Sequence, residues 1–80
     1  MRAVLTELFA DRLIAASPEI QKLFGKQLAY LLRDLRHPSL RAKKYDERRD
    51  LWQARINDNW RFYFTIDGDA YVLLGLISHK

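Results

Sequence analysis

Residues 51–66, LWQARINDNWRFYFTI, alternate between apolar and polar side chains on both sides of the short polar segment NDN. A period of two is typical of a β-strand with one buried face. A three-residue loop at positions 57–59 pairs the apolar residues of the two strands, namely Ile56 with Trp60, Ala54 with Phe62 and Trp52 with Phe64. The same register places Arg55 beside Arg61, and Gln53 beside Tyr63, on the opposite face. We therefore predict an antiparallel hairpin with one core face and one face that carries two neighbouring arginines.

The Arg55–Arg61 pair is unusual, because like charges directly opposite each other destabilise a sheet. An anionic ligand on that face gives a reason for the pair that folding alone does not. The alternative is that Arg61 is an ordinary strand arginine facing solvent.

A second hairpin is expected, since residues 70–78 form another strand pattern after the turn sequence DGD. We expect an odd loop at DGD, which pairs Phe62 with Leu74 and Arg61 with Gly75. This register places four residues on the arginine face: Leu73, Gly75, Ile77 and His79. A two-residue loop would instead turn His79 toward the core, and a bulge in the strand would reverse the assignment.

Two helices are expected before these strands. We expect a short first strand at residues 2–6, and apolar spacing predicts a helix over residues 7–16. Ser17 as N-cap and Pro18 at the first helical position then start a second helix, which ends before Pro38. Its apolar stripe comprises Ile20, Leu23, Phe24, Gln27, Leu28, Leu31, Leu32 and Leu35. The pattern predicts one α+β domain over residues 1–80, with a helical hairpin packed on one face of a small twisted antiparallel sheet.

Positive charge is concentrated in residues 36–49, RHPSLRAKKYDERR, of a chain whose formal net charge is +4. The basic residues of this segment are Arg36, Arg41, Lys43, Lys44, Arg48 and Arg49. The segment has no helical or strand apolar period, so we expect a basic loop. Such a loop beside a strand with outward arginines indicates a polyanionic partner. A solvated surface, or a protein contact for Lys43 and Lys44, is the alternative.

Other properties narrow the class of protein. A chain of 80 residues needs nearly all its apolar side chains for packing, so we expect a shallow site. The absence of cysteine excludes a disulfide and a thiolate nucleophile. Two histidines alone do not build a metal site, and we expect no metal and no small-molecule cofactor. No apolar run approaches the roughly 20 residues of a membrane span, and the start lacks a secretion signal. We expect a soluble, cytoplasmic protein with no membrane partner.

The order of these segments resembles the RelE/ParE superfamily of toxins from bacterial toxin–antitoxin systems. The resemblance covers essentially the whole chain and is most specific in HPSLRAKK, W.ARI and WRFYF in series. It implies a small toxin with a helical hairpin on an antiparallel sheet, neutralised by a cognate antitoxin protein. In the mRNA-cleaving branch the toxin enters the ribosomal A site and cuts the messenger.

The resemblance also implies roles for residues. Arg61 matches the strand arginine that contacts the scissile phosphate, Arg55 matches a basic residue on the neighbouring strand, and His79 resembles the near-terminal histidine of YoeB-like and HigB-like toxins. Gln53 stands where RelE itself has a lysine. The implied catalytic residues are therefore Arg61, His79 and Arg55. The expected RNA-binding residues, drawn from the basic loop, the arginine face and the end of the chain, are Arg41, Lys43, Lys44, Arg48, Arg49, Tyr63 and Lys80.

The implied chemistry is metal-free attack of the ribose 2′-OH on the adjacent phosphorus. A base removes the 2′ proton, fixed cations stabilise the nonbridging oxygens, and an acid protonates the departing 5′ oxygen. Arginine suits the cationic role because its planar fork binds phosphate bidentately. Histidine suits proton transfer. The general base is unassigned, because Asp46 and Glu47 lie closer to Trp52 than the loop carboxylate of YoeB-like toxins would.

The sequence thus predicts a ribosome-dependent mRNA endonuclease whose partners are an antitoxin, the ribosome and mRNA. Two alternatives remain open at this point. One is a ParE-like inhibitor of DNA gyrase, which shares the fold without the catalytic residues. The other is a noncatalytic or degenerate binding module of the same fold.

Overall fold

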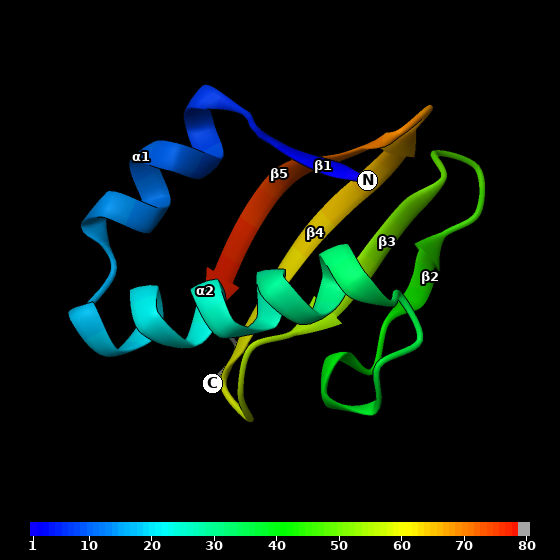
Figure 1. Ribbon diagram of the computed structural model, residues 1–80. Coiled ribbons are helices and arrows are strands. Elements are labelled where there is room, and N and C mark those ends of the chain that lie inside the picture. The colour runs from blue at the N-terminus through cyan, green and yellow to red at the C-terminus, as the bar shows by residue number, and fades with distance from the viewer. Residues whose placement is uncertain (79–80) are drawn as a thin grey trace.

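The computed structural model describes residues 1–78, in which five strands form one sheet with the order β1-β5-β4-β3-β2. The elements are β1 (Arg2–Leu5), α1 (Glu7–Ala15), α2 (Pro18–Arg33), the 3₁₀-helix η1 (Pro38–Leu40), β2 (Lys43–Asp46), β3 (Leu51–Arg55), β4 (Trp60–Asp67) and β5 (Ala70–Ser78). Neighbouring strands are antiparallel except β1, which pairs in parallel with β5. Figure 1 shows α2 lying across the sheet and α1 beside β5. The predicted α+β class is confirmed, and the sheet is mixed rather than purely antiparallel.

Both helices begin at the capping residues that the sequence provides. The Thr6 hydroxyl accepts a hydrogen bond from the Phe9 amide at the start of α1, and the Ser17 hydroxyl accepts one from the Ile20 amide at the start of α2. Pro18 occupies the first turn of α2, as predicted. No helix within residues 1–78 is both long enough and apolar enough to cross a membrane.

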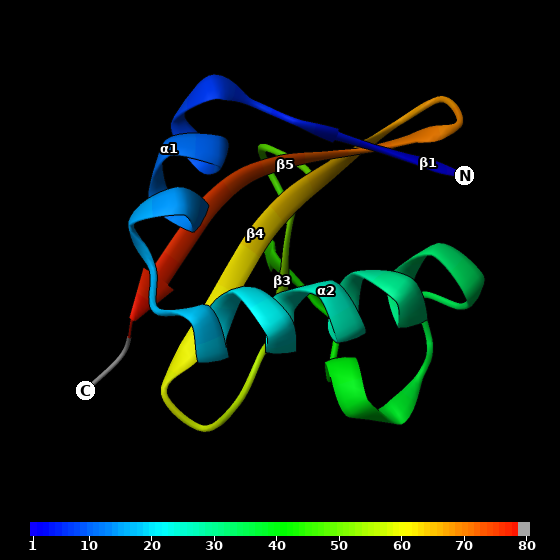
Figure 2. The ribbon, with the colours of Figure 1, turned by 60° about the vertical axis from the view of Figure 1, so that its left-hand side comes forward.

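The core joins the two helices to one face of the sheet. The Phe9 ring of α1 lies 5.1 Å from the Phe24 ring of α2, which in turn lies 5.4 Å from the Phe62 ring of β4 in an edge contact. Phe9, Phe62 and the neighbouring Phe64 are fully buried. Because these contacts link α1, α2 and β4, both helices cover the same face of the sheet, as the turned view in Figure 2 also shows.

The first predicted hairpin has the predicted register. β3 and β4 pair Trp52 with Phe64 and Ala54 with Phe62 on the core face, and Arg55 with Arg61 on the other face. The Ile56 amide donates to the Trp60 carbonyl at 3.0 Å and closes the loop at positions 57–59. The two arginines therefore lie side by side on the face that the helices leave uncovered, which we call the outer face.

The second hairpin differs from the prediction. Asp67 pairs with Ala70, so the loop is a two-residue turn whose first residue, Gly68, has the positive φ of 59° that such a turn needs. The expected pairs of Phe62 with Leu74 and Arg61 with Gly75 are wrong. An irregularity between Tyr63 and Phe64 shifts the register, so that the actual pairs are Phe64 with Leu73, Tyr63 with Gly75, Phe62 with Leu76 and Arg61 with Ile77. Gly75 and Ile77 keep their predicted face, whereas Leu73 is fully buried in the core.

The basic segment is also more ordered than predicted. Residues 43–46 form β2, an edge strand that pairs Lys43 with Gln53 and Lys44 with Trp52. β2 has no apolar alternation because it lies at the edge of the sheet, where backbone pairing alone defines the strand. Before β2, η1 turns the chain, and Arg41 follows it in the left-handed conformation with φ 46°.

Candidate functional site

A hollow of about 380 Å³ lies on the outer face where β2, β3 and β4 meet the end of η1. Its lining residues are Arg41, Lys43, Gln53, Ala54, Arg55 and Arg61. Four of these six side chains carry a positive charge, and no carboxylate lines the hollow. We call it the cationic pocket. Its charge and size suit an anion such as a phosphate group.

The strand registers explain why these residues meet. Lys43, Gln53 and Tyr63 form one row across β2, β3 and β4, and Arg55 and Arg61 form the next row on the same face. Side chains two residues apart on a strand are about 7 Å apart on the same face, so the two rows are adjacent. Arg41 joins them because its left-handed backbone turns the chain from η1 into β2.

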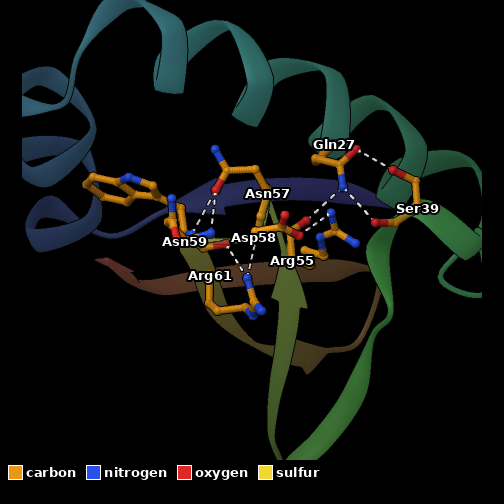
Figure 3. Close-up of polar contacts among 8 residues, drawn as sticks. Gln27, Ser39, Arg55, Asn57, Asp58, Asn59 and Arg61 are labelled. Carbon is orange, nitrogen blue, oxygen red and sulfur yellow. Dashed lines mark hydrogen bonds and ion pairs between the residues drawn. The ribbon is translucent and has the colours of Figure 1, made fainter. Parts of the chain in front are cut away.

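Arg61 is fixed by the loop of the β3–β4 hairpin. Its Nη1 donates hydrogen bonds to the carbonyl of Asn57 and, at 3.0 Å, to the carbonyl of Trp60 (Figure 3). The Asn57 side chain organises the same loop by accepting from the amides of Asn59 and Trp60, each at 2.9 Å. Arg61 is therefore partly structural, in contrast to the alternative of an ordinary strand arginine facing solvent. Its orientation is set before any ligand binds.

Arg55 forms an ion pair within the same loop. Its Nη2 lies 2.9 Å from Oδ1 of Asp58, whose side chain is 89% exposed. This contact offsets the repulsion between the neighbouring Arg55 and Arg61 charges. An exposed ion pair contributes little to stability, so a phosphate can displace the Asp58 carboxylate at small cost.

A buried glutamine of α2 holds two walls of the cationic pocket together. Nε2 of Gln27 donates to the Arg55 carbonyl at 2.7 Å and to the Ser39 carbonyl at 3.0 Å, and Oε1 accepts from the Ser39 hydroxyl at 2.9 Å (Figure 3). Gln27 is only 3% exposed. It thereby connects the end of β3 to η1, two residues before Arg41.

Only part of the predicted RNA-binding set lies in the cationic pocket. Arg41 and Lys43 line it. Lys44 points to the opposite face, where its Nζ lies 5.2 Å from the centre of the Trp52 ring and 2.8 Å from Oδ1 of Asp50. The hydrogen bond with Asp50 raises the pKa of Lys44. Lys44 therefore links β2 to the Trp52 side chain of β3 at the surface, and it does not line the cationic pocket.

The two arginines of the turn after β2 also lie apart from the cationic pocket. Arg48 is exposed in the turn. Arg49 donates from Nε to Oδ2 of Asp46 at 2.9 Å, and this hydrogen bond lowers the pKa of the Asp46 carboxyl. Asp46 is thus an ionised partner of Arg49 within the turn.

Tyr63 lies on the outer face as predicted, but it is only 7% exposed, so it presents little of its ring to a ligand. The Tyr45 ring packs against it edge-on at 5.1 Å. Burial raises the pKa of the Tyr63 hydroxyl, which keeps it protonated near neutral pH. The expected roles of His79 and Lys80 concern residues outside the described part of the chain.

The pocket as described can bind and orient a phosphate, but its lining residues include no group that exchanges a proton near neutral pH. Within residues 1–78, no group of three or more His, Cys, Asp or Glu side chains is placed to hold a metal ion. The positive charges that line the pocket suit an anion.

Sequence reasoning missed two residues that support the pocket. Gln27 was assigned to the apolar stripe of α2, and the signal was a polar residue in that stripe, since a buried amide must find hydrogen-bond partners. Asp58 was assigned only to a turn, although it follows Arg55 by three residues across a tight loop.

No family model matches the sequence, and no curated protein matches it either. Solved structures do match the fold. A YoeB/ParE toxin from Agrobacterium tumefaciens superposes with a TM-score of 0.81 over 100% of both chains at 14% identity. A copper-bound mutant toxin from Helicobacter pylori superposes with a TM-score of 0.73 over 99% of this chain and 94% of that chain, also at 14% identity. The chain therefore has the same fold as these two toxin structures.

Proposed function

We propose that this protein is the toxin of a toxin–antitoxin pair and acts as a ribosome-dependent mRNA endonuclease that inhibits translation. The observation that carries the proposal is the cationic pocket on the outer face, whose lining includes Arg41, Lys43, Arg55 and Arg61 and no carboxylate. The similar folds of the Agrobacterium and Helicobacter toxins support the assignment to toxins.

The proposed reaction needs no metal. The 2′-oxygen of one ribose forms a bond to the adjacent phosphorus while the bond from phosphorus to the 5′-oxygen of the next nucleotide breaks, which leaves a 2′,3′-cyclic phosphate and a free 5′-hydroxyl. Arg61, held by the Asn57 and Trp60 carbonyls, and Arg55 stabilise charge on the nonbridging oxygens. Fixed cations lower the barrier because they need no reorganisation as the charge develops.

Two proton transfers accompany this reaction. We assign one of them to His79, because imidazole exchanges protons near neutral pH and the lining residues of the cationic pocket include no such group. Tyr63 is a poor base, because a tyrosine hydroxyl is protonated near neutral pH and burial raises its pKa further.

We also propose that an antitoxin protein with an acidic segment binds and neutralises this toxin. The outer face carries four basic side chains in the cationic pocket, and Arg48 adds an exposed charge nearby in sequence. An acidic antitoxin segment would bind this face by charge complementarity, so we expect its affinity to fall as salt rises. Binding that is insensitive to salt would instead place the antitoxin on an apolar surface.

Induced expression in bacteria, followed by mapping of messenger 5′ ends, tests the function. We expect growth arrest with new messenger ends within translated codons, and loss of both effects in Arg61→Ala. Arg33→Ala is the matched control, because Arg33 is an exposed arginine in the last turn of α2 and does not line the pocket. Growth arrest with DNA damage and intact messenger would support gyrase inhibition, and the absence of any toxicity would support a noncatalytic module.

A further inference from the structure

A second hollow, of about 480 Å³, lies beside the cationic pocket on the outer face. The lining residues that matter for its chemistry are mainly apolar and come from four strands: Tyr45, Leu51, Tyr63, Leu74, Gly75 and Ile77. We call it the apolar hollow. Two of its side chains leave much of their surface uncovered, since Tyr45 is 59% exposed and Ile77 is 41% exposed.

The floor of the hollow is open because of the irregular pairing of β4 with β5. This irregularity brings Gly75 opposite Tyr63. Gly75 has no side chain, and a Cβ at this position would lie 3.6 Å from the Tyr63 ring. A larger residue would project into the space that Tyr45 and Ile77 flank.

The apolar hollow and the cationic pocket are continuous in the sheet. Gln53 in the pocket pairs with Tyr63 in the hollow, and Arg61 in the pocket pairs with Ile77 in the hollow. Neighbouring strands lie about 4.8 Å apart, so the row Arg55, Arg61 and Ile77 brings positively charged and apolar side chains together within roughly 10 Å of one face. Arg49 adds a further positive charge to the lining of the hollow.

We propose that the apolar hollow binds an unstacked nucleobase of single-stranded RNA, packed against Tyr45, while the phosphate of the same strand occupies the cationic pocket. This inference rests on the proposed function and names the form of substrate that the site takes. Proteins that bind single-stranded nucleic acid combine a basic track with aromatic platforms, and the outer face has both side by side. The exposed Tyr45 ring offers a face on which a nucleobase can stack, and this favours RNA over an acidic peptide segment.

Binding of a short single-stranded RNA, measured by fluorescence anisotropy on the whole protein, tests the proposal. The probe is compared with an oligomer of equal length and charge that lacks its bases. We expect Tyr45→Ala to weaken binding of the base-bearing RNA by about 5- to 150-fold, the loss of one stacking contact, and to leave binding of the abasic oligomer unchanged. Tyr45→Phe, which keeps the ring, should bind like the original protein.

A second variant guards against a folding defect in Tyr45→Ala. Ile77→Gln changes an exposed side chain of the hollow to a neutral polar one, and we expect it too to weaken only the base-bearing probe. An equal loss on both probes, or no loss on either, would overturn the base-binding role of the hollow. Weaker binding of an antitoxin with unchanged RNA binding would also overturn it. If Arg61→Ala and Arg55→Ala bind both probes as tightly as the original protein, the cationic pocket does not bind phosphate. That outcome would contradict the proposed function rather than the base-binding role of the apolar hollow.

Discussion

Replacement of Gln27 by leucine removes the connection between α2, η1 and the end of β3 without changing the size of the side chain much. Gln27 is buried and uses both ends of its amide, donating to the carbonyls of Ser39 and Arg55 and accepting from the Ser39 hydroxyl. Leucine can make none of these hydrogen bonds. The Ser39 hydroxyl can turn to another acceptor, whereas the two carbonyls lose a donor inside the fold.

The magnitude follows from these two carbonyls. A buried acceptor left without a donor costs about 1–3 kcal/mol. Because both carbonyls are only partly buried and leucine adds apolar contacts, we expect Gln27→Leu to lower the free energy of unfolding by about 2–4 kcal/mol in total. For a domain of this size, that loss corresponds to a fall in Tm of about 10–25 °C.

Thermal and urea unfolding followed by circular dichroism measure the effect, and Gln21→Leu is the matched control. Gln21 lies in the same helix and places its Nε2 within 3.3 Å of the carbonyls of Leu13, Ile14 and Ala16, but it is exposed, so water can replace it. We expect this control to lose at most about 1 kcal/mol. If Gln27→Leu is no less stable than Gln21→Leu, the buried hydrogen bonds do not hold the pocket walls together.

Arg61→Ala should lower the free energy of unfolding by about 1 kcal/mol through loss of its hydrogen bonds to the loop carbonyls, and should abolish growth inhibition; a fully toxic variant would contradict the phosphate-binding role. His79→Gln should slow messenger cleavage by about 10²- to 10⁴-fold in a reconstituted translation assay while ribosome binding stays the same, and an unchanged cleavage rate would remove His79 from the mechanism. Burial raises the pKa of the Tyr63 and Tyr71 hydroxyls, so the folded protein favours the protonated form of both side chains. The stability that this preference contributes is complete below the unfolded-state pKa of about 10, and it is lost as the pH rises through the higher folded-state pKa values. Urea midpoints should therefore fall above about pH 10, and less so in Tyr71→Phe; equal falls in both proteins would show that Tyr71 is not responsible.

The first hairpin was predictable because several features of its sequence specify the same strand pairing. In residues 51–66 the apolar alternation, the polar loop and the pairing of large side chains all specify one register. The neighbouring Arg55 and Arg61 followed from that register, and so did the face on which the site lies. The capping residue Ser17 was predictable for a similar reason, since serine is a favoured N-cap and proline is favoured at the first helical position that follows it.

The second hairpin and β2 were not predictable from alternation. The turn sequence allows two loop lengths, and the irregularity after Tyr63 depends on how the strand fits its neighbours rather than on any local residue pattern. β2 carries mostly polar side chains, and its strand conformation comes from hydrogen bonds to β3. At the site, alternation located the arginines but gave no sign that Arg61 bonds to the loop or that Asp58 pairs with Arg55.

The parallel pairing of β1 with β5 has a consequence for the order of events during synthesis. Within residues 1–78, β1 pairs with β5 alone, and the Thr6 hydroxyl at the start of α1 donates to the Leu73 carbonyl at 2.8 Å. A nascent chain emerges from its amino end, so β1 and α1 wait for residues 70–78 before they can dock. Until then β4 also lacks one of its two neighbours. The sheet that carries Arg61 is therefore completed only after residues 70–78 have been synthesised and have left the ribosome, so the nascent chain has no assembled site before then.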